Sequence, residues 1–158
     1  MKKYWFLSLS FFILILDRVT KEWVVKNFYR FETKKILGNF LRFTYTRNPH
    51  GVFGIPLGGK YLSLILTLCA FVFVIYLFII SKERFLAFAL SLIIGGAMGN
   101  LWDRLTAGSV VDFIDVGIGR WRWPTFNVAD SFVTIGIILA VAYWFFEEKR
   151  KGARSTCV

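Results

Sequence analysis

Four apolar runs, each close to the length of a bilayer crossing, constrain this chain more than any other feature. They cover about residues 4–25, 61–80, 85–102 and 131–146, and the first and last need their polar ends to reach that length. About 20 helical residues cross the roughly 30 Å of hydrocarbon in a bilayer. The chain is 56% hydrophobic, more than a soluble domain of its size can bury. We predict a mainly α membrane protein of four transmembrane helices, forming a single domain over residues 1–158.

Basic residues next to these runs predict the orientation of the helices. Lys2 and Lys3, the turn at 82–84 and the tail at 147–154 are basic and lie at one end of the four spans. The positive-inside rule places them in the cytoplasm, with both termini, and the segments of about 26–60 and 103–130 outside. The first outer segment carries seven Lys or Arg against this rule, but it is long enough to fold as a unit and could meet anionic headgroups.

The start of the first run and the net charge of the chain suggest two other classes of protein. The start resembles a signal peptide, but no small-residue cleavage site follows it, and we interpret it as a retained helix. The net charge of +10 is distributed around apolar runs, which indicates membrane anchoring rather than nucleic-acid binding.

The outer segments differ in composition from the spans. Residues 40–46 are rich in aromatic and β-branched types, and Gly38-Asn39 is a turn signal, so a small sheet at the outer surface is expected. The second outer segment contains several glycines, Trp121 and Trp123. Tryptophan is typical of the membrane–water interface.

Acidic residues are rare in the spans and gather at one depth. A carboxylate at a helix centre in a bilayer costs about 2.5–3.5 kcal/mol on insertion scales, so such groups face a partner, a cavity or a substrate. The predicted topology brings polar residues that are far apart in sequence to a common layer near the outer face. They are Asp17, Asn48, Asn100, Asp103, Arg104, Asp112, Asn127 and Asp130.

Several of these carboxylates also have purely structural interpretations. Asp17 and Lys21 are four residues apart and can pair on one helix face. Asp103 with Arg104 fits a helix-end charge cluster, and Asp130 fits an N-cap or first-turn position. The glycines at 95, 96 and 99 allow another backbone to approach the third span closely.

Asp112 has the weakest structural explanation among the acidic residues. It lies between Val111 and Phe113 with no basic residue beside it. Asp115, in contrast, lies in a glycine-rich stretch and is expected to be a solvated loop residue.

Two carboxylates held close together can hydrolyse a peptide bond. Like charges cannot both ionise easily, so the pair shares one proton; the ionised member activates water and the protonated member donates to the carbonyl oxygen. Such chemistry needs no cofactor, which suits a chain with one histidine (His50) and two scattered cysteines (Cys69 and Cys157), where a metal or haem site is not expected. Serine–lysine chemistry competes in principle, but Ser63 and Ser91, the candidate nucleophiles within the spans, lack a nearby lysine.

Four segments in order resemble the motifs of the bacterial lipoprotein signal peptidases (signal peptidase II). They read DRVTK at 17–21, GGAMGNLWDR at 95–104, GSVVDF at 108–113 and FNVADS at 126–131. The resemblance covers nearly the whole chain. It implies an inner-membrane aspartic endopeptidase with a periplasmic β-cradle, which removes signal peptides from prolipoproteins after the lipobox cysteine has received diacylglycerol, cutting on the N-terminal side of that cysteine.

The resemblance also implies roles for individual residues. Asp112 and Asp130 match the catalytic pair. Residues expected to bind substrate are Asn48, Asn100, Arg104, Asn127 and Ala129, and those expected to support the site are Asp17, Lys21, Gly51, Phe53 and Asp103. Implied partners are the diacylglyceryl-modified prolipoprotein, membrane lipids and globomycin-type inhibitors, with no cofactor, metal or nucleic acid.

One segment departs from the family pattern. The family commonly has Asn, any residue, Gly, two small residues and Phe, whereas residues 48–53 read NPHGVF, with His50 at the usual glycine position. The departure puts the local backbone of this loop in question, not the aspartate pair.

Three other functions remain open on the residues alone. A small proton- or ion-coupled carrier would need carboxylates across the membrane depth, but the second span has none and the inner halves of the others have none. A membrane adaptor without chemistry would leave the aspartate pair dispensable. A presenilin-type protease would carry Gly-x-Gly-Asp, which the stretch 99–103 does not match.

Overall fold

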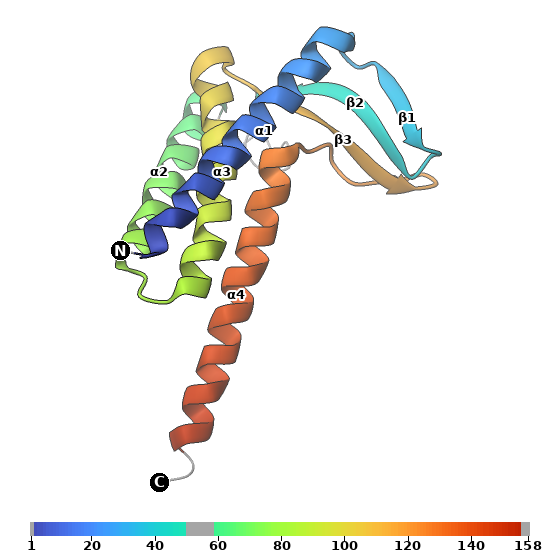
Figure 1. The fold of residues 1–158 in the computed structure, drawn as a ribbon. Helices are drawn as coiled ribbons and strands as arrows, with labels where there is room; N and C mark the ends of the chain where they lie inside the picture. The colour runs from blue at the N-terminus through green and yellow to red at the C-terminus, as the bar shows by residue number, and fades with distance from the viewer. Residues whose placement is uncertain (1, 50–58, 156–158) are drawn as a thin grey trace.

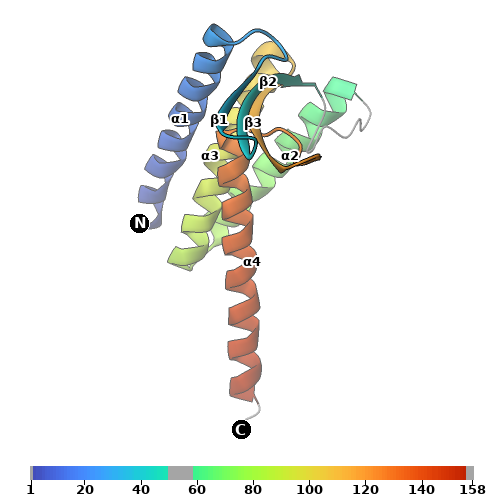
Figure 2. The same cartoon turned by 90° about the vertical axis from the view of Figure 1, so that its right-hand side faces the viewer.

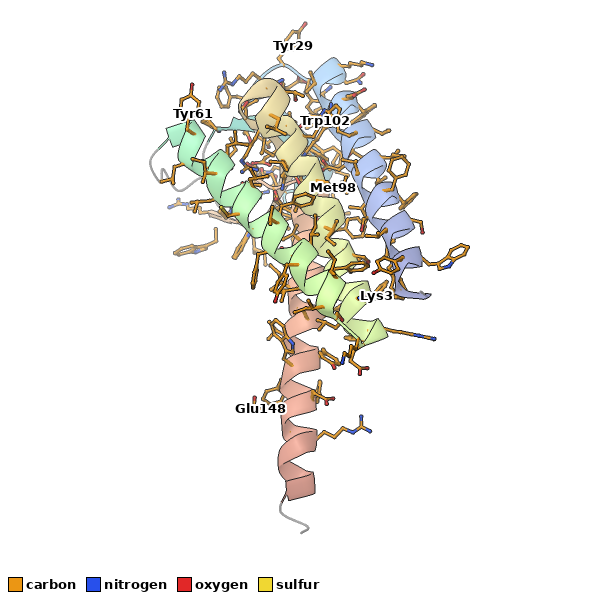
Figure 3. The ribbon with its side chains drawn as sticks, turned by 90° about the vertical axis from the view of Figure 1, so that its left-hand side faces the viewer. Lys3, Tyr29, Tyr61, Met98, Trp102 and Glu148 are labelled. Carbon is orange, nitrogen blue, oxygen red and sulfur yellow. The ribbon has the colours of Figure 1, made fainter. Side chains whose placement is uncertain are left out.

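The computed structural model describes residues 2–49 and 59–155 and consists of long helices with a small sheet at one end. A short 3-10 helix, Lys2–Trp5, leads into α1 (Phe6–Asn27); the other helices are α2 (Gly59–Ile80), α3 (Arg84–Ala107) and α4 (Val128–Ser155). Both termini lie away from the sheet, and α4 extends well past the other helices (Figure 1). Tyr29 and Tyr61 lie at the sheet end, whereas Lys3 and Glu148 lie toward the other (Figure 3).

The sheet has four antiparallel strands in the order β1-β2-β3-β4. The strands are β1 (Thr33–Leu37), β2 (Leu41–Asn48), β3 (Val110–Ile118) and β4 (Trp121–Arg122). Strands β1 to β3 project sideways from the helices (Figures 1 and 2). The strand expected over 40–46 is confirmed as β2, and the turn expected at Gly38 has the positive φ of +54° that glycine accommodates.

One sequence prediction about the second outer segment is wrong. Asp115 is not a solvated loop residue: it lies in β3, is buried, and pairs with the guanidinium Nε of Arg122 at 2.6 Å. The hydroxyl of Thr44, on the neighbouring strand β2, also donates to Asp115 at 3.1 Å. The glycines of this segment suggested a loop, but β2 supplies the pairing partner that makes it a strand.

Helix α3 packs against each of the other three helices. It continues to Ala107, beyond the apolar run that was expected to end near residue 102, so Asp103 and Arg104 lie on its last turns, at the helix end where the sequence places them. Its glycines allow the close contacts that the sequence predicted: a Cβ on Gly95 would lie 2.9 Å from the Cα of Ser10 on α1, and one on Gly96 would collide with the carbonyl oxygen of Ala129 on α4.

Replacing Gly96 with Ala should therefore separate α3 from α4. The new methyl group meets backbone, which cannot rotate away as a side chain can. We expect a loss of about 1–3 kcal/mol in the free energy of unfolding, the usual cost of overpacking. The matched control is Leu105→Ala on the same helix, where the side chain is 65% exposed and the change should be within about 0.5 kcal/mol. Equal stability of the two variants in detergent would contradict this packing.

Three of the described helices are long and apolar enough to cross a membrane: residues Tyr61–Ile80, Arg84–Ala107 and Val128–Arg150. The 22-residue α1 is not among them, because its sequence includes several charged residues. Those charges are unevenly placed. Asp17 and Lys21 are buried on the side facing the protein, whereas Phe11, Phe12, Ile15 and Val19 are exposed. The helix thus directs large apolar side chains outward and keeps Asp17 and Lys21 on its buried face, together with the apolar Ile13 and Val24.

Candidate active site

The first turn of α4 fixes the position of Asp130. Asn127 precedes the helix, and its side-chain oxygen accepts the backbone N–H of Asp130 at 2.9 Å. In return, Oδ2 of Asp130 accepts the backbone N–H of Asn127 at 3.3 Å. This reciprocal arrangement is a capping box, with Asp in the place usually taken by Glu or Gln. The first-turn position predicted for Asp130 is confirmed, and it also directs the carboxylate toward the other polar groups of the site.

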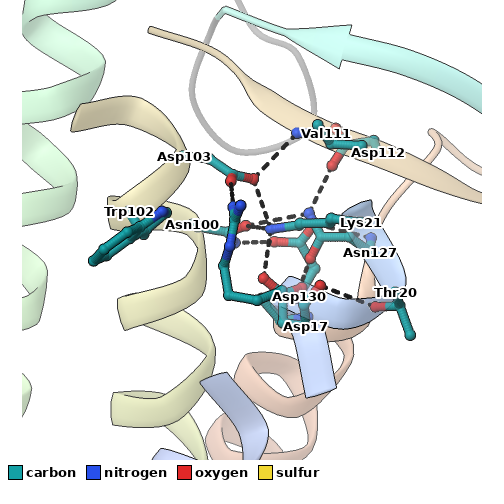
Figure 4. A network of polar contacts seen from close by, with 12 residues as sticks. Asp17, Thr20, Lys21, Asn100, Trp102, Asp103, Val111, Asp112, Asn127 and Asp130 are labelled. Atoms are coloured by element: carbon teal, nitrogen blue, oxygen red, sulfur yellow. Dashed lines mark hydrogen bonds and ion pairs between the residues drawn. The ribbon is translucent and has the colours of Figure 1, made fainter. Parts of the chain in front are cut away.

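Asp112 reaches the same place from the sheet. It lies in β3 opposite Thr46 of β2 and is buried beside Val111 and Phe113. The side-chain nitrogen of Asn127 donates to Oδ1 of Asp112 at 2.7 Å. One asparagine therefore binds both aspartates, and the two carboxyl groups from different elements lie on either side of it (Figure 4).

Asn100 of α3 forms a second amide bridge. Its side-chain nitrogen donates to Oδ1 of Asp130 at 2.7 Å. Its side-chain oxygen accepts from Asn127 at 3.2 Å and from the ammonium of Lys21 at 3.0 Å. Asn100 thereby connects the aspartate pair to α1.

Lys21 lies in a buried ion cluster behind the aspartates. Its Nζ is 2.7 Å from Asp17 and 2.9 Å from Asp103, and the side chains of all three residues are at most 4% exposed. Arg18 forms a further ion pair with Asp103. The two carboxylates also bind backbone of the site: Asp17 accepts the N–H of Ala129 at 2.9 Å, and Asp103 accepts the N–H of Val111 at 3.3 Å. The cluster thus ties α1 and α3 to the segments that carry the aspartate pair.

Arg104 supplies a second positive charge near the pair. Its Nε donates to the hydroxyl of Ser63 on α2 at 3.1 Å, and its Nη1 donates to the carbonyl of Asn100 at 3.4 Å. Among carboxylates, its strongest electrostatic partner is Asp130, followed by Asp112 and Asp103. Arg104 therefore lies where it can interact with charge that develops at the aspartates.

The surroundings of Asp112 favour its protonated form. Burial, together with the neighbouring charge of Asp130, raises its pKa to about 7. Hydrogen bonds with the side chains of Asn127 and Asn48, and the charge of Lys21, oppose the shift. The pKa of one carboxyl of the pair therefore lies near neutral pH, where it can gain or lose a proton during a reaction.

The structure brings together most of the residues that the sequence singled out. Among them are Asp17, Lys21, Asn48, Asn100, Asp103, Arg104, Asp112, Asn127, Ala129 and Asp130. Ala129 contributes its backbone N–H. His50, Gly51 and Phe53 lie outside the described residues.

Two contributors were not predicted. Ser63 was considered only as a nucleophile, yet it holds Arg104; as a serine in an apolar run, it did carry a signal for a polar partner. The sequence analysis predicted no partner for Arg18, which pairs with Asp103.

Within residues 2–49 and 59–155, no three His, Cys, Asp or Glu side chains are grouped as metal ligands.

Comparison with known proteins identifies the family of this chain. A family model described as "Signal peptidase (SPase) II" matches residues 9–146. The lipoprotein signal peptidase of Syntrophus aciditrophicus is 37% identical over 92% of this chain and 95% of its own, and that of Blochmanniella pennsylvanica is 40% identical over 89% and 88%. A solved structure described as a bacterial membrane enzyme matches with a TM-score of 0.85 and 33% identity over 92% of this chain and 90% of its own. The residues matched by the family model, 9–146, include those of the polar network from Asp17 to Asp130.

Proposed function

The chain belongs to the signal peptidase II family, and from this premise we propose that it cleaves the signal peptide from diacylglyceryl-modified prolipoproteins with Asp112 and Asp130 as its catalytic pair. One observation carries the assignment of the pair: Asn127 binds Asp112 and Asp130 at once, although they come from a strand and a helix. The family relationship supports an aspartic protease, and nothing in the comparisons supports a membrane carrier.

The proposed reaction uses the two carboxyl groups in turn. The ionised carboxylate takes a proton from water as the water oxygen bonds to the scissile carbonyl carbon. The protonated carboxyl gives its proton to the carbonyl oxygen, which yields a gem-diol. When the C–N bond breaks, the first carboxyl returns its proton to the leaving nitrogen and the second recovers a proton from a diol hydroxyl, so the pair ends as it began.

The polar residues around the pair have proposed roles in binding substrate. Arg104 engages carbonyl oxygens of the substrate backbone or of its lipid, and Ser63 holds the guanidinium in place. Asn48 is the last residue of β2. It interacts with Asp112 and orients substrate backbone groups beside it. Ala129 is fully buried next to Asp130, and its proposed contribution is the backbone N–H that it donates to Asp17.

We also propose that α1 is a fourth membrane span and that the site lies near the outer face. The outward-facing Phe11, Phe12 and Ile15 support a helix in contact with lipid. The basic ends of the chain support cytoplasmic termini. The sheet then lies on the periplasmic side of the inner membrane, and the acyl chains of the substrate stay in the outer leaflet during cleavage.

Labelling with a membrane-impermeant maleimide tests this topology. With the native cysteines replaced by serine, a cysteine introduced for Arg120 near the sheet end should react in intact spheroplasts. A cysteine introduced for Lys149 on α4 should react only after the membrane is opened. The reverse pattern would overturn the orientation.

The rate of cleavage should depend on pH through the protonated carboxyl. Burial places the pKa of Asp112 at about 7, so the protonated fraction falls as pH rises through that value. We expect kcat/KM to decrease about tenfold per pH unit on the alkaline side, with a midpoint near pH 7 for the pair as a whole. A profile that stays flat from pH 6 to well above pH 8 would contradict the role of this proton.

Cleavage of matched substrates tests the function itself. Purified protein is incubated with a diacylglyceryl-modified preprolipoprotein and with the same protein left unmodified. Cleavage of the lipidated form alone, on the N-terminal side of the modified cysteine, is expected, together with inhibition by a globomycin-type compound. Equal cleavage of both forms, or of neither, would count against the proposal.

A further inference from the structure

We propose that Asp112 carries the proton that the pair shares, and that Lys21, acting through Asn100, keeps Asp130 ionised. The inference rests on the proposed function only in treating these aspartates as the reacting pair. It divides the roles: Asp130 is the base that activates water, and Asp112 is the acid that protonates the substrate carbonyl.

The first step concerns the orientation of Asn100. The ammonium of Lys21 has donors only, so the atom of Asn100 that lies 3.0 Å from it must be the side-chain oxygen. The side-chain nitrogen then faces Oδ1 of Asp130, 2.7 Å away. Asn100 can therefore offer Asp130 an N–H donor and not an acceptor.

The orientation of Asn127 is fixed in the same way. Its side-chain oxygen accepts a backbone N–H, that of Asp130, which has no lone pair to offer in return. Its side-chain nitrogen must then point toward Oδ1 of Asp112 and the oxygen of Asn100. Neither amide can turn over without placing two donors, or two acceptors, against each other.

These orientations favour a negative charge on Asp130. Both of its oxygens accept N–H groups, from Asn100 and from the backbone of Asn127. A carboxylate that accepts two such bonds is stabilised in its ionised form. Asp130 also lies in the first turn of a helix, where the dipole stabilises negative charge, and it is the strongest carboxylate partner of Arg104.

The surroundings of Asp112 favour a neutral carboxyl. It lies on a strand, among the buried side chains of Val110, Val111 and Phe113, and it meets the N-cap residue of α4 through the side-chain amide of Asn127. Asn127 occupies Oδ1 as a donor. The hydrogen bonds from Asn127 and Asn48 oppose this effect of burial, but they do not outweigh it.

The other charged groups around the pair do not reverse this division. Lys21 is held between Asp17 and Asp103, and Arg18 pairs with Asp103, so these charges largely compensate one another. Arg104 lies on the α3 side and interacts more strongly with Asp130 than with Asp112. Ionising Asp112 would place a second negative charge beside Asp130 without a new positive one.

Infrared spectroscopy of the full chain tests the assignment without substrate. With aspartate labelled by 13C, the C=O stretch of a protonated aspartic acid is followed at about pH 6, below the value near which the pair loses its proton. We expect the band in the wild-type protein and in Asp130→Asn, and its loss in Asp112→Asn. A band that survives in Asp112→Asn, or that disappears from both variants, overturns the assignment.

The role of Asn100 has its own readout. Asn100→Leu removes the N–H donor to Asp130. Because this is a hydrogen bond to a charged group, its loss should lower the ratio of ionised to protonated Asp130 by about tenfold or more. The acid band should therefore reappear when Asn100→Leu is added to Asp112→Asn. No reappearance would show that Asn100 serves only the packing. If Asp112→Asn still cleaved substrate, the proposed function would fall while the infrared assignment stood.

Discussion

Replacing Asp112 or Asp130 with Asn should reduce signal peptide cleavage by about 10²–10⁴-fold, the usual contribution of a general acid or base. An amide side chain keeps the size and one acceptor oxygen of the carboxyl group, but it cannot take a proton from water or give one to the substrate. The other two carboxylates of this network, Asp17 and Asp103, are both paired with Lys21, so neither is expected to replace the lost group. Turnover is measured with the lipidated substrate in detergent micelles.

The matched control for this experiment is Asp115→Asn. Asp115 is a buried aspartate on the same strand as Asp112, but it pairs with Arg122 and takes no part in the site. We expect this variant to keep its activity, which separates loss of the chemistry from a general effect of removing a buried carboxylate. Near-normal cleavage by either Asp112→Asn or Asp130→Asn would refute their assignment as the catalytic pair.

Replacing Lys21 with Met should cost about 3–5 kcal/mol in the free energy of unfolding. The substitution preserves the apolar stem of the side chain but removes the charge that Asp17 and Asp103 share. Breaking a buried ion pair on one side leaves an uncompensated buried charge, which is the origin of this cost. The lysine is 1% exposed, so water cannot replace it.

Lys34→Met provides the comparison. Lys34 also lies within 4 Å of a carboxylate, that of Glu32, but its side chain is 48% exposed. Exposed pairs contribute about 0–1 kcal/mol, so this variant should unfold close to wild type. Denaturant unfolding or steric trapping in micelles measures both. A loss below about 1 kcal/mol for Lys21→Met would show that the cluster is not a structural requirement.

The polar network was predictable because topology and hydrophobicity constrain it together. Once apolar runs set the spans, their polar ends had to meet at one depth, and the helical spacing of Asp17 and Lys21 predicted their ion pair. The glycines of α3 predicted close packing for a similar reason, since nothing but a backbone approach explains them in a membrane helix.

The wrong prediction for Asp115 and the contacts that were not predicted depend on how separate helices and strands pack together. Asp115 was read as a loop residue because β3 becomes a strand only when β2 lies beside it, and Arg122 is brought to it by the β3–β4 hairpin. Ser63 and Arg104 lie on different helices, and no local pattern relates them. Likewise, Arg18 finds Asp103 only through the packing of α1 on α3.

The capping box at the start of α4 makes the activity depend on the integrity of one helical turn. Asn127 and Asp130 hold the helix start and the carboxyl group proposed to be catalytic in one arrangement. A small molecule that loosened this single turn would release Asp130 from position and let the two carboxyl groups drift apart. Such a compound would act as an inhibitor without resembling the lipoprotein.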